Sequence, residues 1–229
     1  MISPKENRLC YVSEKQRKIL LQLINEPTIE EQFFLTGGTA LSVFYLHHRM
    51  SNDLDLFSLQ QANLSELGFW IRGLWPGESA VIREAPHFLS CLILETKIDL
   101  VIDPLSIDEK RPIKVFENGH KLQIDTIQGI VSNKLCACVS RTEPKDYVDL
   151  YAIFKTLPEI TFDTVYAMAK KKDAIFDDPP TAAFQLEEGV ALIKEKPEII
   201  PQLLIPFDFD DFFIFYKDLT MWLYKKLRM

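Results

Sequence analysis

The sequence predicts an α+β protein in which a small mixed β-sheet lobe flanked by helices is followed by a helical C-terminal lobe. Two observations predict this fold. Short apolar or alternating runs typical of strands lie in the first half of the chain, among helical segments. From Thr126 onwards almost every segment has helical spacing, and prolines separate these segments. We therefore expect two domains, an α/β core over residues 1–120 and a helical lobe over residues 121–229.

The first expected helix covers Ser13–Asn25. Ser13 and Gln16 have the spacing of a capping box, apolar residues form one stripe, and Pro27 lies just beyond the end. The next apolar run, Phe33–Leu35, predicts a short strand that stops at the Gly37-Gly38 pair. The following stretch, Thr39–Leu46, has helical composition. This part of the chain is therefore predicted to be a strand, a tight turn and a helix.

The segment Asp53–Phe57 alternates polar and apolar side chains, as a half-buried strand does. Both of its aspartates, Asp53 and Asp55, should then project from one face. A helix is expected over Leu64–Leu74, and two strands, Ser90–Leu94 and Lys97–Ile102, are expected to be joined by the turn Glu95-Thr96. The helical lobe is predicted to contain five helices, at Ile127–Val139, Lys145–Lys155, Asp163–Lys172, Thr181–Lys194 and Asp208–Lys226.

Composition limits the class of protein. The 229 residues are 47% hydrophobic and 26% charged, which is ordinary for a chain that is folded throughout. Met1–Tyr11 lacks the apolar core of a signal peptide, and no window approaches about 18 consecutive apolar residues. We therefore expect a cytoplasmic protein that does not enter a membrane.

Charge and cysteine spacing exclude further classes. A net charge of −7 argues against a surface that is basic overall, so any RNA partner should meet a local patch. The four cysteines show neither C-x-x-C spacing nor a nearby histidine cluster. They are predicted to be buried free thiols.

Three aspartates carry the predicted chemistry. Asp53 and Asp55 share a strand, and Asp99 lies on a later strand, so the three carboxylates could converge. Carboxylate oxygens are the ligands that Mg²⁺ prefers, and a nucleoside triphosphate supplies further oxygens. Two ions about 3.5–4 Å apart would activate an attacking hydroxyl and neutralise the leaving pyrophosphate. Asp103 is an alternative third carboxylate, but Pro104 marks the end of its strand.

The residues around the first strand suit a triphosphate. Gly37 and Gly38 let the backbone approach a phosphate at a helix start, and Thr39 adds a hydroxyl donor. Arg49 and Ser51 precede the aspartates and offer a guanidinium and a second hydroxyl. Each feature alone is more often plain surface or a simple turn. A glycine turn, a D-x-D strand and a later strand aspartate, in that order, predict a nucleotide site.

These residues also resemble a known family. Gly37–Leu41 together with His48–Phe57 resembles the first motif of the AbiEii/AbiGii-type nucleotidyltransferases, which belong to the polymerase-beta-like superfamily. Lys134, Arg141 and the element Lys145–Tyr151 are similar to a later motif of that family. The resemblance spans about Phe33 to Tyr151.

The resemblance implies nucleotide bound between a small sheet lobe and a helical lobe, with Mg²⁺ as cofactor and a nucleoside triphosphate such as ATP as substrate. It assigns Asp53 and Asp55 as metal ligands and, less directly, Asp99 as the third carboxylate. Lys134 matches a nucleotide-phosphate contact, and Asp146 matches the aspartate of the second motif.

The later residues also have structural interpretations. Lys134 could be an ordinary solvated lysine, and Asp146 could serve only the start of its helix, where acidic side chains favour the helix dipole. Arg141 could pair with Asp146 or Asp149.

The family includes toxins of toxin–antitoxin and phage-defence systems, so an RNA acceptor and an antitoxin partner are expected. Two alternatives stay open: a catalytically inactive regulator that binds nucleotide or a partner, and a transferase that adds AMP or UMP to protein.

Overall fold

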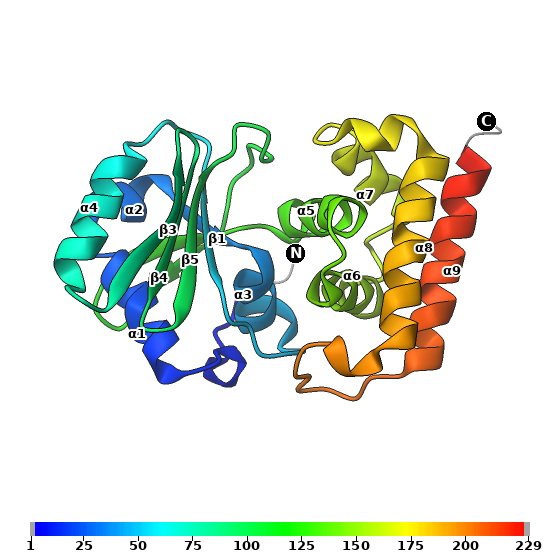
Figure 1. The fold of residues 1–229 in the computed structure, drawn as a ribbon, viewed down its shortest axis with the longest axis horizontal. Helices are drawn as coiled ribbons and strands as arrows, with labels where there is room; N and C mark the ends of the chain where they lie inside the picture. Colours follow the sequence, from blue (N-terminus) through cyan, green and yellow to red (C-terminus); the bar gives the residue numbers. More distant parts are fainter. Residues whose placement is uncertain (1–2, 227–229) are drawn as a thin grey trace. The chain divides into compact units, whose positions relative to one another are not determined.

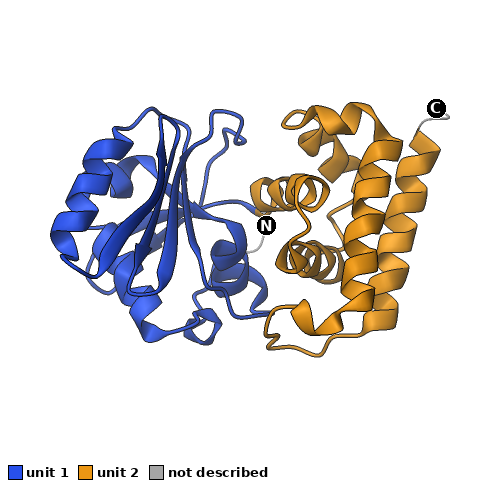
Figure 2. Cartoon of the chain, viewed as in Figure 1, with its two compact units in different colours: residues 1–126 blue, residues 127–229 orange. Residues whose placement is uncertain are grey.

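The computed structural model describes residues 3–226 and divides the chain into two compact units, Met1–Thr126 and Ile127–Met229 (Figure 2). The predicted α+β class is confirmed, with a mixed sheet in the first unit and helices in the second. The sequence placed the boundary near residue 120. Strand β7 (Lys121–Ile124) follows that point and belongs to the first unit because it pairs with β1 (Phe34–Thr36).

The first unit is built on one seven-stranded sheet, in the order β3-β4-β5-β2-β1-β7-β6. β2 pairs in parallel with β5 and β1 in parallel with β7, while all the other neighbouring strands are antiparallel. The remaining strands are β2 (Leu54–Ser58), β3 (Ser79–Ala85), β4 (Phe88–Ile93), β5 (Thr96–Ile102) and β6 (Ile113–Val115).

Helices cover one face of this sheet. α1 (Glu14–Leu23), α2 (Pro27–Gln32) and α4 (Leu64–Leu74) lie along that face, where the inward side chains of β2 and β5 are buried (Figure 1). The predicted cap of α1 is confirmed, because Ser13 Oγ accepts a hydrogen bond from Gln16 N at 3.3 Å. Pro27, expected to mark a helix end, instead opens α2, because a first-turn proline loses no helical hydrogen bond.

The opposite face carries polar side chains at its centre. α3 (Gly37–Leu41) follows β1 directly and continues into a π-helical turn, Ser42–Leu46. The β4–β5 hairpin turns at Leu94 and Glu95, which have left-handed φ values of 46° and 71°. The turn therefore lies one residue earlier than predicted, and Thr96 belongs to β5. A short 3₁₀ turn, Arg8–Cys10, precedes α1.

The second unit is helical. Its helices are α5 (Ile127–Ser140), α6 (Pro144–Thr156), α7 (Phe162–Ala169), α8 (Pro179–Glu195) and α9 (Phe209–Lys226), with 3₁₀ turns at Ala174–Asp177 and Pro197–Ile199. α8 and α9 lie side by side (Figure 1). Tyr216 of α9 is buried and donates to the carbonyl of Tyr147 on α6 at 2.7 Å. Phe212, Leu219 and Leu223 of α9 are also buried, so this side of the helix belongs to the core of the second unit.

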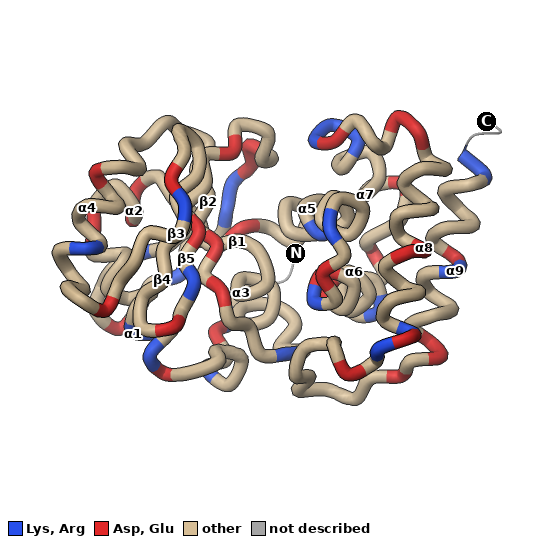
Figure 3. The backbone as a smooth tube through the Cα atoms, in the orientation of Figure 1, with Lys and Arg blue, Asp and Glu red and all other residues tan. Residues whose placement is uncertain are grey.

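Two surface properties bear on function. Within residues 3–226, no helix is both long and apolar enough to cross a membrane. Acidic and basic residues are interleaved along both units (Figure 3).

Cys10, Cys91 and Cys138 are buried free thiols as predicted, whereas Cys136 is partly exposed.

Candidate active site

The predicted carboxylates lie on the sheet face that α1, α2 and α4 leave uncovered. Asp55 on β2 and Asp99 on β5 are direct register partners in parallel strands, so both side chains leave the same face. Strand spacing places their backbones about 5 Å apart. Asp53 lies two residues before Asp55, immediately ahead of β2. Side chains alternate between the two faces along an extended segment, so Asp53 belongs to the same face as Asp55. Leu54, the one residue between them, is buried on the other face.

Asp99 is held by two neighbours. Ser90 Oγ, on β4, donates to Asp99 Oδ1 at 2.6 Å, and Lys97 Nζ donates to Asp99 Oδ2 at 2.6 Å. Burial alone lowers the pKa of Lys97, but the hydrogen bond and charge of Asp99 outweigh that effect and raise this pKa above its usual value. The charges of Asp53 and Asp55 act in the same direction. All three carboxylates therefore act on one ammonium group.

The carboxylate oxygens of Asp53, Asp55 and Asp99 are ligands of the chemical type that Mg²⁺ prefers. Asp55 and Asp99 share the sheet face opposite α1, α2 and α4, Asp53 directly precedes β2, and a cationic group, Lys97 Nζ, lies against Asp99. In the described part of the chain, no three histidine, cysteine, aspartate or glutamate side chains are gathered closely enough to hold a metal ion. Asp99 is bound to Lys97 in this conformation. The metal role of Asp53, Asp55 and Asp99 stays a prediction.

The glycine pair fits only because it lacks side chains. Gly37 has a φ of 68°, and an added Cβ would lie 2.1 Å from Asp55 Oδ2. A Cβ at Gly38 would lie 2.3 Å from Arg49 Nη2. Backbone therefore lies directly against the Asp55 carboxylate, and the contact of Gly37 and Gly38 with a phosphate stays a prediction.

Thr39, Arg49 and Ser51 are buried beneath this turn. The Thr39 hydroxyl donates to the backbone carbonyl of Asp53 and lies 2.9 Å from Ser51 Oγ. Arg49 Nη1 donates to the carbonyl of Met50 at 2.8 Å. These contacts fix the segment that leads into β2. The predicted contact of these three residues with nucleotide stays a prediction.

Asp103, the alternative third carboxylate, forms hydrogen bonds within a turn. Its oxygens accept from Leu105 N at 3.0 Å and from Ser106 Oγ at 2.7 Å. It therefore caps the turn after β5, where the sequence predicted that the strand ends.

A further buried acid, Asp125, was missed by sequence reasoning. Thr36 Oγ1 donates to Asp125 Oδ2 at 2.6 Å, and Arg111 Nε donates to Asp125 Oδ1 at 3.1 Å. Thr36 is also the register partner of Asp55. Burial raises the pKa of Asp125 despite these donors. No sequence feature pointed to Asp125, because β7 had not been recognised as a strand.

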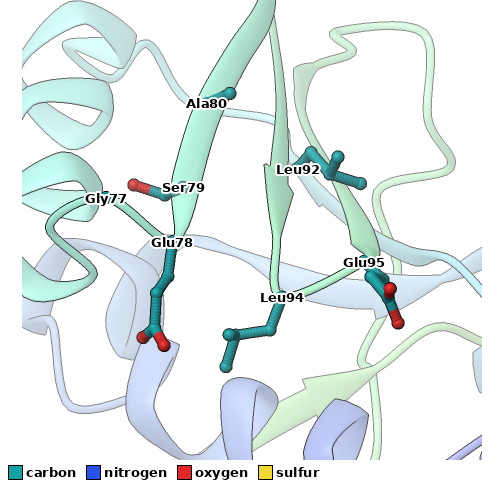
Figure 4. Close-up of a pocket in the computed structure, with 7 residues that line it drawn as sticks. All are labelled: Gly77, Glu78, Ser79, Ala80, Leu92, Leu94 and Glu95. Atoms are coloured by element: carbon teal, nitrogen blue, oxygen red, sulfur yellow. The ribbon is translucent and has the colours of Figure 1, made fainter.

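A mainly apolar pocket of about 300 Å³ lies at the end of the β3–β4–β5 segment (Figure 4). Its lining residues are Gly77, Glu78, Ser79, Ala80, Leu92, Leu94 and Glu95. Leu92 is the register partner of Lys97, so the pocket borders the carboxylate face. It contains none of the three aspartates.

The second unit gathers the residues of the later motif into a buried ion network. Lys134 Nζ lies 2.7 Å from Asp146 Oδ1 and 2.6 Å from Asp149 Oδ2, and both carboxylates are fully buried. Arg141 Nη2 lies 2.9 Å from Asp146 Oδ2, as one sequence interpretation expected. Lys134 is also buried, so it is not a solvated lysine. Its contact with a nucleotide phosphate and the catalytic role of Asp146 stay predictions.

Comparison with a family model supports the resemblance. Residues 18–90 match the family described as "Nucleotidyl transferase AbiEii toxin, Type IV TA system". The match contains the glycine pair and the D-x-D strand, and ends before Asp99. No curated protein sequence matches the chain.

Solved structures share the fold. JHP933 from Helicobacter pylori aligns with a TM-score of 0.52 and 22% identity, covering 94% of each chain. MenT4, the nucleotidyltransferase toxin Rv2826c from Mycobacterium tuberculosis H37Rv, aligns with a TM-score of 0.55 and 13% identity. That alignment covers 90% of this chain and 82% of MenT4. Fold and motif together agree with the resemblance drawn from the sequence.

Proposed function

We propose that this chain, a nucleotidyltransferase that carries the AbiEii-type motif within residues 18–90, transfers a nucleoside monophosphate from a triphosphate to an acceptor hydroxyl, with Mg²⁺ as cofactor. The proposed acceptor is the 3′ end of an RNA. One observation carries this proposal: Asp55 and Asp99 are register partners on the sheet face opposite α1, α2 and α4, with the Gly37 backbone against Asp55.

The three aspartates are proposed to bind the metal and to assist removal of the acceptor's proton. Asp53, Asp55 and Asp99 would hold Mg²⁺, which when bound supplies positive charge to the phosphates and favours ionisation of the attacking hydroxyl. Asp99 also helps to remove the proton of the acceptor hydroxyl. The acceptor oxygen bonds to the α-phosphorus, and the bond from that phosphorus to the bridging oxygen of the β-phosphate breaks, so pyrophosphate leaves.

The loop residues position these groups. Gly37 and Gly38 let the backbone pass close to the side chains of Asp55 and Arg49, and the proposed phosphate contact is placed at this turn. Thr39, Arg49 and Ser51 keep the segment before β2 in place through their buried contacts. Lys134 and Asp146 are proposed to take part on the ground of the resemblance alone.

A toxin role is part of the proposal. The matching family model describes a toxin of a type IV toxin–antitoxin system, and MenT4 is a nucleotidyltransferase toxin. We infer that this chain acts as the toxin of such a module and is restrained by an antitoxin protein.

The test is transfer of label from each α-³²P-labelled triphosphate to total cellular RNA or to lysate protein, in the presence of Mg²⁺. The native chain is compared with Asp53→Ala and with Asp103→Ala, a control acid that caps a turn. Labelled RNA is expected from the native chain and from the control but not from Asp53→Ala, and a chelator should stop the reaction. Full activity of Asp53→Ala would defeat the assignment.

The same assay separates the alternatives. Label in protein rather than RNA would indicate AMP or UMP transfer to protein. Triphosphate binding without any turnover would indicate an inactive regulator.

A further inference from the structure

Lys97 occupies a position on the carboxylate face where a metal cation would be expected. It precedes Asp99 by two residues on β5, so both side chains leave the same face. Its Nζ lies 2.6 Å from Asp99 Oδ2. The other Asp99 oxygen, Oδ1, is held by Ser90. In this conformation a protein ammonium supplies the positive charge beside Asp99.

The two partners differ in their freedom to move. The Lys97 side chain is 44% exposed, whereas the Asp99 side chain is 13% exposed. The lysine stem is flexible, and its ammonium can leave towards water without any change in the backbone. Asp99 stays in place because Ser90, on the neighbouring strand β4, still donates to Oδ1. Lys97 can therefore be exchanged for another cation while Asp99 keeps its position.

Resting on the proposed function, we propose that Lys97 is a resident counter-ion of the carboxylate face, which a divalent cation displaces from Asp99 when the site is loaded. Lys97 is then a positioning residue. In the unloaded protein it reduces repulsion among Asp53, Asp55 and Asp99. It also competes with the metal, so it raises the cation concentration at which the site fills.

The assignment predicts that removal of Lys97 tightens divalent-cation binding, because the ammonium repels the cation and occupies an oxygen of Asp99. An exposed ion pair contributes little, so the expected tightening is about three- to fivefold. The effect depends on Asp99, because that carboxylate is the group for which Lys97 and the metal compete.

The experiment measures Mn²⁺ affinity of the full chain without nucleotide, from the electron paramagnetic resonance signal of free Mn²⁺. The variants are Lys97→Met, Asp99→Asn, the double variant of these two, and Asp53→Asn. The control is Lys155→Met, which removes a lysine at the same 2.6 Å distance from an aspartate, Asp211, and with a similar exposure of 49%. Circular dichroism verifies that each variant is folded.

Tighter Mn²⁺ binding by Lys97→Met, unchanged binding by Lys155→Met and no effect of Lys97→Met in the Asp99→Asn background would support the assignment. Unchanged or weaker binding by Lys97→Met would overturn it while leaving the proposed function intact. The proposed metal site fails separately if Asp53→Asn binds Mn²⁺ as the native chain does, and the inference fails with it.

Discussion

Gly37 lies against the carboxylate of Asp55, so closely that a methyl group at Gly37 would come within 2.1 Å of Asp55 Oδ2. Asp55 in turn is the register partner of Asp99 on β5 and of Thr36 on β1. The position of the carboxylate therefore depends on the absence of a side chain at the turn that follows β1.

Replacing Gly37 with alanine should cost both stability and activity. Its φ of 68° is left-handed, which costs an L-residue about 1–2 kcal/mol, and the clash with Asp55 adds to that cost. Displacement of a catalytic group by about 1 Å can lower the rate by about 100-fold. Transfer assays and urea unfolding measure the two effects.

Gly77→Ala is the matched control. Gly77 has a similar φ of 74°, but nothing lies within 4 Å of an added Cβ. The Gly77→Ala variant should lose a comparable amount of stability, because its backbone is equally left-handed, and it should keep the transfer activity of the native chain. Equal activity of the Gly37 and Gly77 variants would show that the contact with Asp55 is unimportant.

Lys134→Met should strongly destabilise the second unit. The substitution leaves the buried carboxylates of Asp146 and Asp149 without the ammonium that bridges them, which typically costs about 3–5 kcal/mol. Lys155→Met, which breaks the exposed pair with Asp211, should cost at most about 1 kcal/mol. Urea unfolding followed by far-UV circular dichroism gives both values. Similar losses for the two variants would contradict the structural role of Lys134.

Gly189→Ala should destabilise the chain, although alanine usually favours a helix. An added Cβ on α8 would lie 2.0 Å from Tyr147 Oη, which donates to the carbonyl of Cys138 at 2.7 Å. Overpacking of this kind costs about 1–3 kcal/mol. Gly73→Ala in α4 meets nothing within 4 Å and should instead stabilise, by up to about 1 kcal/mol. Melting temperatures of the two variants should therefore shift in opposite directions.

Stability in acid should depend on Glu117. Hydrogen bonds from Arg17 lower the pKa of Glu117 from 4.5 to about 2. A depressed pKa means that the stabilisation is present above the unfolded value and is lost as the pH falls towards about 2. Glu117→Gln should therefore melt below the native chain near neutral pH, and this difference should shrink below about pH 4. Because the Glu117 side chain is 54% exposed, screening keeps the effect small. A difference that is constant with pH would rule out this linkage.

Local patterns predicted the elements that position the site. Alternation around Leu54 and Leu56 indicated β2, and the pair Ser13 and Gln16 indicated the start of α1, because both depend on neighbouring residues. β3, β6 and β7 were missed. The edge strand β3 contains exposed charged residues, and β6 and β7 are too short for a clear alternating pattern.

Contacts between residues on different strands or helices could not be predicted from the sequence. The spacing of Lys97 and Asp99 placed them on one face and could have indicated their contact, but the hydrogen bond from Ser90 depends on strand register. Lys134 was expected either to contact a nucleotide phosphate or to be an ordinary solvated lysine. The spacing of Asp146 and Asp149 puts both on one side of α6, and only the packing of α5 against α6 places Lys134 between them.

The late position of β7 in the chain affects how the first unit can be made. β1 lies inside the sheet between β2 and β7, yet β7 is synthesised only when the ribosome reaches residue 124. A truncated fragment that stops at residue 90 lacks β5 and β7, so β1 and β2 would each keep one open edge prone to aggregation. Recombinant expression of the first unit should therefore extend through Thr126.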